Sequence, residues 1–152
     1  MLRSSGTDGT VSSRQDAVHQ LVRGFDRRDW QTVEHLLADT VVSDYTAMLG
    51  GEPQSRTAGE RTRHYQEQLD PLDATMHAAT TLLVDLDGDR ATASVNILTW
   101  LRREATQDGP LWSNGSAGEI ELTRTEGRWR IARITVRPAW AEGNRGVLES
   151  AH

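Results

Sequence analysis

The sequence predicts an α+β domain in which N-terminal helices pack against a curved, mainly antiparallel sheet. In the first half of the chain, apolar residues recur at the spacing of amphipathic helices. From Ala74 onward, four long strand-like segments are separated by turn sequences. Residues 119–123 alternate polar with apolar side chains, as expected of a sheet with one buried face. Helices followed by a meander of long strands are typical of the α+β class.

The length of 152 residues is that of one domain. We expect this domain to span residues 12–144. Residues 1–11 are small and polar and predict a flexible N-terminal tail, and we expect residues 145–152 to form a C-terminal tail.

Two helices are expected first. Residues 13–16 resemble a capping box, and the apolar residues behind them predict a helix that ends near Arg28. Asp29 is suited to cap a second, shorter helix. The apolar face of the first helix consists of Val18, Leu21, Val22 and Phe25.

A short strand at residues 41–45 and a turn at residues 50–53 come next. Thr57 and Glu60 form a second capping box, which opens a polar helix that must stop before Pro71. The four long strands are expected at residues 74–86, 91–104, 111–125 and 129–139.

Composition excludes several classes of function. With no cysteine, the chain has no disulfide, no thiolate nucleophile and no cysteine-type zinc site. The net charge of −5 and the scattered arginines disfavour nucleic-acid binding. No apolar run is long enough to span a membrane, and no signal-peptide core is visible, so we expect a cytoplasmic protein. Histidine spacing predicts no metal site, and we expect no cofactor.

Asp26 and His77 are the candidates for acid–base chemistry. Asp26 lies at the edge of the apolar face of the first helix, where a carboxylate can point toward the core or into solvent. His77 lies among small and apolar residues in the first long strand, and an imidazole in a pocket is a natural general base near neutral pH. A hydrogen-bonded core histidine without a catalytic role is the alternative.

Other polar and aromatic residues are candidates for substrate contacts. The phenol of Tyr45 could donate to a carbonyl or hold a water, or it could be an ordinary rim tyrosine. On the long strands Trp100, Asn114, Ser116 and Arg137 could bind substrate if strand alternation turns them inward.

The order of these features resembles the SnoaL-like proteins of the nuclear-transport-factor-2-like superfamily, and within them the scytalone dehydratase and bile-acid dehydratase branch. The resemblance covers roughly residues 13–144. It rests on Asp26-Arg-Arg-Asp29-Trp30, Asp44-Tyr45 and Thr75-Met76-His77. It implies a cone-shaped, barrel-like fold.

The resemblance also implies roles. An Asp at the position of Asp26 hydrogen-bonds a His at that of His77, which exchanges protons with the substrate. A Tyr matching Tyr45 holds a water or the substrate carbonyl, Ser116 falls near a polar pocket residue, and a pocket Arg of the bile-acid branch aligns with Arg137.

The chain departs from these relatives around the expected Asp–His pair. The second pocket His of scytalone dehydratase is missing from residues 99–101, and its pocket Asn corresponds to Gly118. We therefore expect a cofactor-independent cyclase, isomerase or dehydratase that acts on a small, mainly apolar, polyketide-like or polycyclic molecule. A non-catalytic small-molecule-binding or assembly domain is the alternative, and a pocket filled by Trp100 and Trp112 would favour it. A homodimer formed through the convex face of the sheet is also expected.

Overall fold

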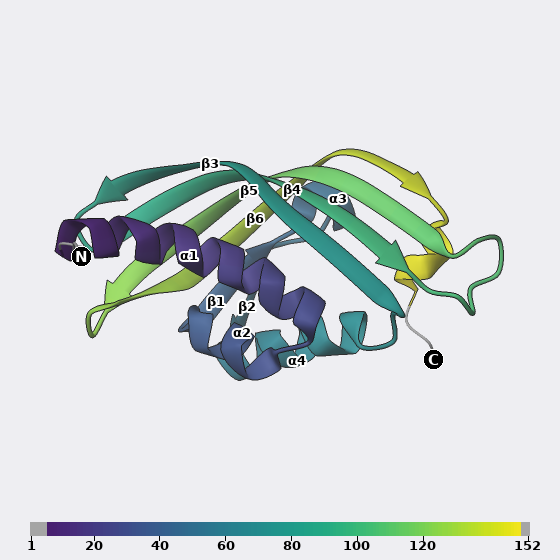
Figure 1. Cartoon of the computed structure of the whole chain (residues 1–152), viewed down its shortest axis with the longest axis horizontal. Coiled ribbons are helices and arrows are strands. Elements are labelled where there is room, and N and C mark those ends of the chain that lie inside the picture. Colours follow the sequence, from purple (N-terminus) through teal and green to yellow (C-terminus); the bar gives the residue numbers. More distant parts are fainter. Residues whose placement is uncertain (1–5, 150–152) are drawn as a thin grey trace, which may run out of the picture.

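A single curved sheet determines the shape of the molecule. The computed structural model describes residues 6–149. The strand order is β2-β1-β6-β5-β4-β3, and every neighbouring pair is antiparallel except β1 and β6, which run parallel. Figure 1 shows the long strands arching over α1. The strands are β1 Leu37–Asp44, β2 Gln54–Thr57, β3 Ala74–Asp87, β4 Arg90–Arg102, β5 Leu111–Thr125 and β6 Arg128–Gly143.

Helices α1, α2 and α4 lie on the concave side and at the lower edge of the sheet (Figure 1). The four predicted apolar positions of α1 are all buried in the core, which confirms the amphipathic pattern. Helix α1 packs along β3, and α2 packs against α1 and α4. The helices are α1 Gly6–Arg27, α2 Trp30–Leu36, α3 Thr46–Leu49 and α4 Ala58–Leu69, with a final 3-10 turn η1 at Arg145–Leu148.

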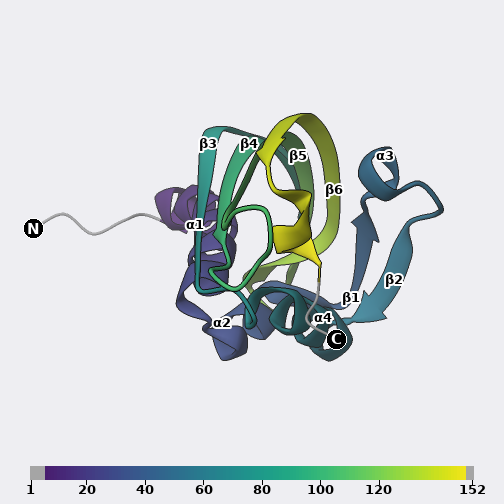
Figure 2. The same cartoon turned by 90° about the vertical axis from the view of Figure 1, so that its right-hand side faces the viewer.

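Two predicted helix starts are confirmed. The side chain of Asp29 accepts a hydrogen bond from the Thr32 backbone N–H at 3.2 Å and caps α2. Thr57 and Glu60 form both hydrogen bonds of a capping box, and α4 ends at Leu69, ahead of Pro71. Neither α3 nor β2 was expected; β2 pairs with β1 at the edge of the sheet. Figure 2 shows both standing apart from the four long strands.

The predicted start of the first helix is wrong. Helix α1 begins at Gly6, so the expected capping box at residues 13–16 lies inside it, and residues 6–11 of the expected tail are helical. A helix whose packed part is already formed extends by one hydrogen bond per residue without a new nucleation cost, so even weak helix formers can join it. Residues 1–5 lie outside the described part of the chain.

The expected C-terminal tail is also wrong in its first part. Asn144 caps η1, its Oδ1 accepting from the Gly146 backbone N–H at 2.9 Å. The side chain of Val147 is only 1% exposed. Burying this apolar side chain against the sheet holds residues 145–148 in place. Residues 150–152 lie outside the described range.

The interior divides into a packed end and a hollow end. Near the β3–β4 and β5–β6 hairpins, core side chains such as Ala93, Leu122 and Ile131 are almost completely buried. At the other end the sheet and the helices enclose a cavity, which η1 also lines. No helix within residues 6–149 is long and apolar enough to cross a membrane.

Candidate active site

Asp26 and His77 are in direct contact. The imidazole Nδ1 of His77 lies 2.7 Å from Oδ1 of Asp26. The backbone N–H of His77 donates to Oδ2 of the same carboxylate at 2.8 Å. The contact expected from the sequence is therefore present, and it joins the C-terminal end of α1 to the beginning of β3.

The way in which α1 ends determines the position of the Asp26 carboxylate. The N–H of Arg28 donates to the Phe25 carbonyl at 3.2 Å and that of Asp29 to the Gly24 carbonyl at 2.9 Å, which is the Schellman pattern of helix ends. Arg28 adopts the left-handed conformation at φ 57°, where glycine is usual.

The side chain of Arg28 supports the Asp26 carboxylate through a threonine. Its Nη1 donates to Oγ1 of Thr75 at 2.8 Å, and this hydroxyl donates to Oδ1 of Asp26 at 2.9 Å. The carboxylate therefore accepts three hydrogen bonds, from the Thr75 hydroxyl and from the ring and backbone of His77.

These contacts keep Asp26 ionised. Burial raises the pKa of this carboxyl, but hydrogen bonds from the His77 ring, the His77 backbone and Thr75 outweigh it, so the pKa lies below its ordinary value of 3.8. An ionised carboxylate can only accept, so Nδ1 of His77 carries a proton. In the neutral ring the lone pair is then on Nε2, the nitrogen that can take up a proton.

His77 borders a cavity of about 510 Å³. The cavity is mainly apolar, and its walls come from α1, α4, η1 and the inner face of the sheet. Side chains that form these walls include Leu21, Phe25, Ile97, Ile134 and Val147. Nε2 of His77 has no hydrogen-bond partner among the side chains of residues 14–149, so it is available to a bound molecule.

A polar row crosses the sheet from His77. In the strand register His77 lies opposite Thr99, which in turn lies opposite Asn114. Paired residues share a face, and strands are about 4.8 Å apart, so the row spans about 10 Å of cavity wall. Ser116 also lines the cavity, and its hydroxyl lies 3.4 Å from Oδ1 of Asn114. The structure thus brings Asn114 and Ser116 to the cavity that His77 lines.

Tyr45 lines the same cavity, at the end of β1. Its oxygen accepts a hydrogen bond from Nη2 of Arg61 at 3.1 Å, which leaves its own proton free to donate. Burial, followed by the nearby Tyr65, raises the pKa of Tyr45 well above its ordinary value despite the opposing effect of Arg61. Tyr45 is therefore a neutral donor at physiological pH.

Two expected substrate contacts are not at this cavity. Trp100 is 45% exposed, because its neighbours Thr99 and Leu101 point inward and strand alternation turns it outward. Arg137 is exposed for the same reason, next to the inward-facing Val136. The Trp100 and Arg137 predictions are corrected accordingly.

Helix α4 contributes residues that the sequence analysis passed over. Arg61 is 3% exposed and Tyr65 is 6% exposed, and both line the large cavity with His64. Arg61, Tyr65 and Leu69 follow an i, i+4, i+8 pattern, which marks one inward face in an otherwise polar helix. That spacing was the feature of the sequence from which the inward position of Arg61 and Tyr65 could have been predicted.

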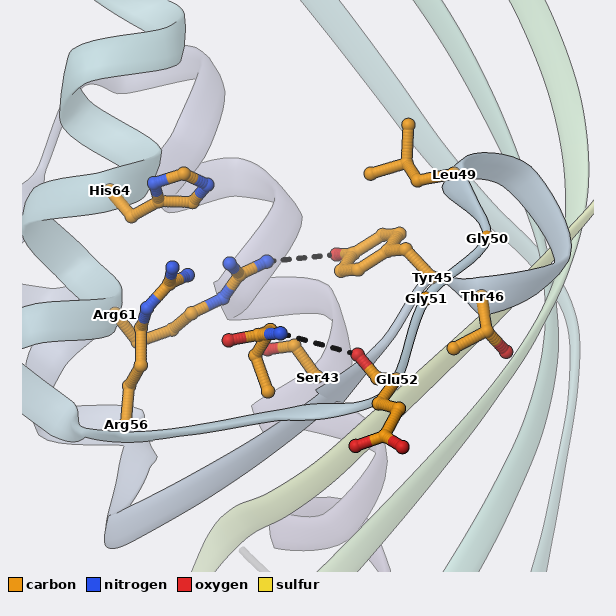
Figure 3. A pocket seen from close by; sticks show the side chains of 11 residues that line it. Ser43, Tyr45, Thr46, Leu49, Gly50, Gly51, Glu52, Arg56, Arg61 and His64 are labelled. Atoms are coloured by element: carbon orange, nitrogen blue, oxygen red, sulfur yellow. Dashed lines mark hydrogen bonds between the residues drawn. The ribbon is translucent and has the colours of Figure 1, made fainter.

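A second, smaller cavity of about 260 Å³ adjoins this face of α4. Figure 3 shows Arg61 reaching toward Tyr45, with Arg56 and His64 beside it. In the described part of the chain, no three histidine, aspartate or glutamate side chains gather closely enough to hold a metal ion.

The sequence matches the family model of the SnoaL-like domain over residues 14–135. The chain belongs to the SnoaL-like family. No curated protein sequence matches it at a significant level.

Solved structures share the fold of this SnoaL-like domain. A protein from Kribbella flavida has a TM-score of 0.86 at 18% identity, covering 93% of this chain and 98% of that one. A candidate scytalone dehydratase from Novosphingobium aromaticivorans has a TM-score of 0.78 at 11% identity, covering 96% and 93%. A type 2 hexachlorocyclohexane dehydrochlorinase has a TM-score of 0.77 at 13% identity, covering 96% of both chains. These likenesses confirm the predicted fold, in which N-terminal helices pack on a curved, mainly antiparallel sheet.

Proposed function

We propose that this SnoaL-like domain is an acid–base enzyme that moves a proton on a small, mainly apolar, polyketide-like or polycyclic molecule. The observation that carries the proposal is the Asp26–His77 pair, with Nδ1 of the ring on the carboxylate and the ring itself bordering a mainly apolar cavity. No step of the proposed reaction requires a cofactor.

In the proposed step, Nε2 of His77 removes a proton from a carbon next to a carbonyl or a leaving group. The ionised Asp26 holds the ring in place and stabilises the imidazolium that forms. The free hydroxyl proton of Tyr45 stabilises the developing oxyanion, assisted by Asn114 or Ser116 on the sheet. Positioned proton transfer of this kind contributes about 10²–10⁴-fold in rate.

Cyclases, isomerases and dehydratases can all begin with this proton transfer, so the three reaction types share one site. Two of the structurally similar proteins bear names that describe eliminations, a dehydratase and a dehydrochlorinase. An elimination completes the same sequence when a leaving group departs from the neighbouring carbon. We therefore favour elimination among the three.

The alternative, a binding or assembly domain without chemistry, would be favoured by a pocket filled with tryptophan. Trp100 faces outward, and Trp112 is not among the residues that line the cavity. The large cavity thus retains space beside His77, which supports the enzyme.

The proposal is tested by proton exchange, which needs no natural substrate. Polycyclic ketones such as β-tetralone are incubated with the protein in deuterium oxide, and deuterium incorporation next to the carbonyl is followed by NMR. We expect exchange above the buffer rate, reduced about 10²–10⁴-fold in His77→Gln. His35→Gln, on an exposed position of α2, is the control and should exchange like the wild type. Equal rates in His77→Gln and the wild type would refute the assignment.

A further inference from the structure

Arg61 is a buried cation without an acidic partner. The residue is 3% exposed, and it forms no ion pair with the side chains of residues 14–149. Its Nε has no hydrogen-bond partner among the described residues. Its Nη2 donates to the Tyr45 oxygen at 3.1 Å, and its guanidinium carbon lies 4.0 Å from the ring centroid of Tyr65 and 5.3 Å from that of Tyr45.

These contacts compensate the charge only in part. A buried charge is costly unless it is both paired and hydrogen-bonded, and buried arginines ordinarily meet a carboxylate. A phenol oxygen and an aromatic face supply hydrogen bonding and cation–π attraction but no negative charge. Among the described residues, the positive charge of Arg61 therefore lacks a compensating negative charge.

Arg61 stands where the two cavities meet. Tyr45, Leu49, Arg61 and His64 line both the large cavity and the small one. Arg56 lines the small cavity and, like Arg61, forms no ion pair within the described residues. Figure 3 shows Arg56 and Arg61 both lining the small cavity.

Negative charge near this junction does not neutralise it. Glu52 lines the small cavity, but Figure 3 shows its carboxylate directed away from both arginines. Glu149 lines the large cavity from an exposed position and makes no ion pair with Arg61. The positive charge of the two arginines also acts on His64, whose pKa is lowered first by burial and then by the charges of Arg61 and Arg56.

We propose that the substrate is an organic acid, whose carboxylate binds Arg61 at the junction of the two cavities while its apolar body occupies the large cavity beside His77. The planar guanidinium can offer two parallel N–H groups to a carboxylate, and Arg56 adds positive charge on the outer side. The reacting end and the charged end of the substrate would then be held by different elements, β3 and α4. This inference rests on the proposed function for the identity of the substrate, but binding can be measured without turnover.

The test compares matched ligands by calorimetry on the full chain. The probes are β-naphthoate and anthracene carboxylate, each paired with its neutral primary amide, with acetate as an anion that lacks an apolar body. We expect each carboxylate to bind about tenfold or more tightly than its amide, and acetate to bind weakly. Arg61→Met should weaken carboxylate binding about tenfold or more and leave amide binding unchanged. Arg102→Met, which removes an exposed arginine paired with Glu104, is the matched control.

A second readout separates binding from a structural role. Removing an unpaired buried charge should leave the melting temperature of the ligand-free protein unchanged or raised in Arg61→Met. Arg61→Lys keeps the positive charge without the planar guanidinium and should bind carboxylates with intermediate affinity. This variant replaces Arg61→Met in the test if Arg61→Met does not fold.

The inference is overturned if amides bind as tightly as carboxylates, if no carboxylate binds, or if Arg61→Met lowers the melting temperature without changing carboxylate affinity. Asp26→Asn should retain the preference for carboxylates. A carboxylate preference without ketone exchange would therefore overturn the proposed reaction and leave this site standing.

Discussion

The hydroxyl oxygen of Tyr45 accepts a hydrogen bond from an N–H of Arg61. If its free proton stabilises an oxyanion, Tyr45→Phe should lower kcat by about 10²–10³-fold and leave the melting temperature nearly unchanged. Steady-state kinetics on an exchanging ketone measure this directly. Thr80→Val is the control, because it removes an exposed hydroxyl of β3 that does not line the cavity. Unchanged kcat in Tyr45→Phe would make Tyr45 a packing residue.

Asp26 should make the stability of the folded protein depend on pH in the acid range. Its folded-state pKa lies below 3.8, so the ionised carboxylate stabilises the folded protein above that pH. This contribution is lost as the pH falls through the lower folded-state pKa. The difference in melting temperature between the wild type and Asp26→Asn should therefore shrink as the pH falls below 3.8, where Asp26 becomes protonated. Thermal denaturation in this acid range checks it, and a difference that grows as the pH falls below 3.8 would contradict the account.

Single residues differ in how far sequence could place them. Asp26 and His77 could be predicted because Asp26 lies at the edge of a helix face and His77 lies in a strand, and this order of residues resembles that of the SnoaL-like family. Trp100 was misplaced because inward and outward positions alternate, and no sequence feature fixed which set of β4 faces the cavity. The burial of Arg61 without a carboxylate is a property of the packed structure and leaves no mark in composition.

At the scale of elements, the approach of α1 to α2 depends on Gly24. A Cβ built at Gly24 would lie 2.7 Å from Cγ2 of Val33, which is completely buried and cannot move aside. Gly24→Ala should therefore destabilise the protein by about 1–3 kcal/mol, despite the better helix propensity of alanine. Gly59→Ala is the control in α4, where the nearest atom is Oε1 of Glu34 at 3.4 Å. It should be neutral or stabilising by chemical denaturation, and equal stability losses in both variants would contradict this packing.

Sequence patterns predicted the long elements better than the ends. The strands expected at residues 74–86 and 111–125 match β3 and β5, because alternation and hairpin turns are local properties. The C-terminal turn was missed because Val147 is buried only through contacts with distant strands. Likewise β2 is a short edge strand whose pairing with β1 involves the tertiary fold.

At the scale of the whole molecule, the outer face of the sheet carries exposed apolar side chains. Met76 and Trp100 are register partners that are 64% and 45% exposed, and Trp140, opposite Gly115, is 43% exposed. We propose that two copies of the chain pair through this face with two-fold symmetry. Light scattering should give twice the mass of the chain at micromolar concentration, and Trp100→Glu should give a monomer. A wild-type monomer would contradict the proposal.

The central claim is that Asp26 holds His77 as the Nδ1–H tautomer, so that Nε2 is the base inside the cavity. Nitrogen NMR shifts of labelled protein report which nitrogen carries the proton in the neutral ring. We predict a protonated Nδ1 and an unprotonated Nε2 in the wild type. In Asp26→Asn the amide can donate to Nδ1 and should favour the opposite tautomer, with a loss of exchange activity. A wild-type neutral ring protonated on Nε2 would contradict the account, because that nitrogen could not then accept a proton from a substrate.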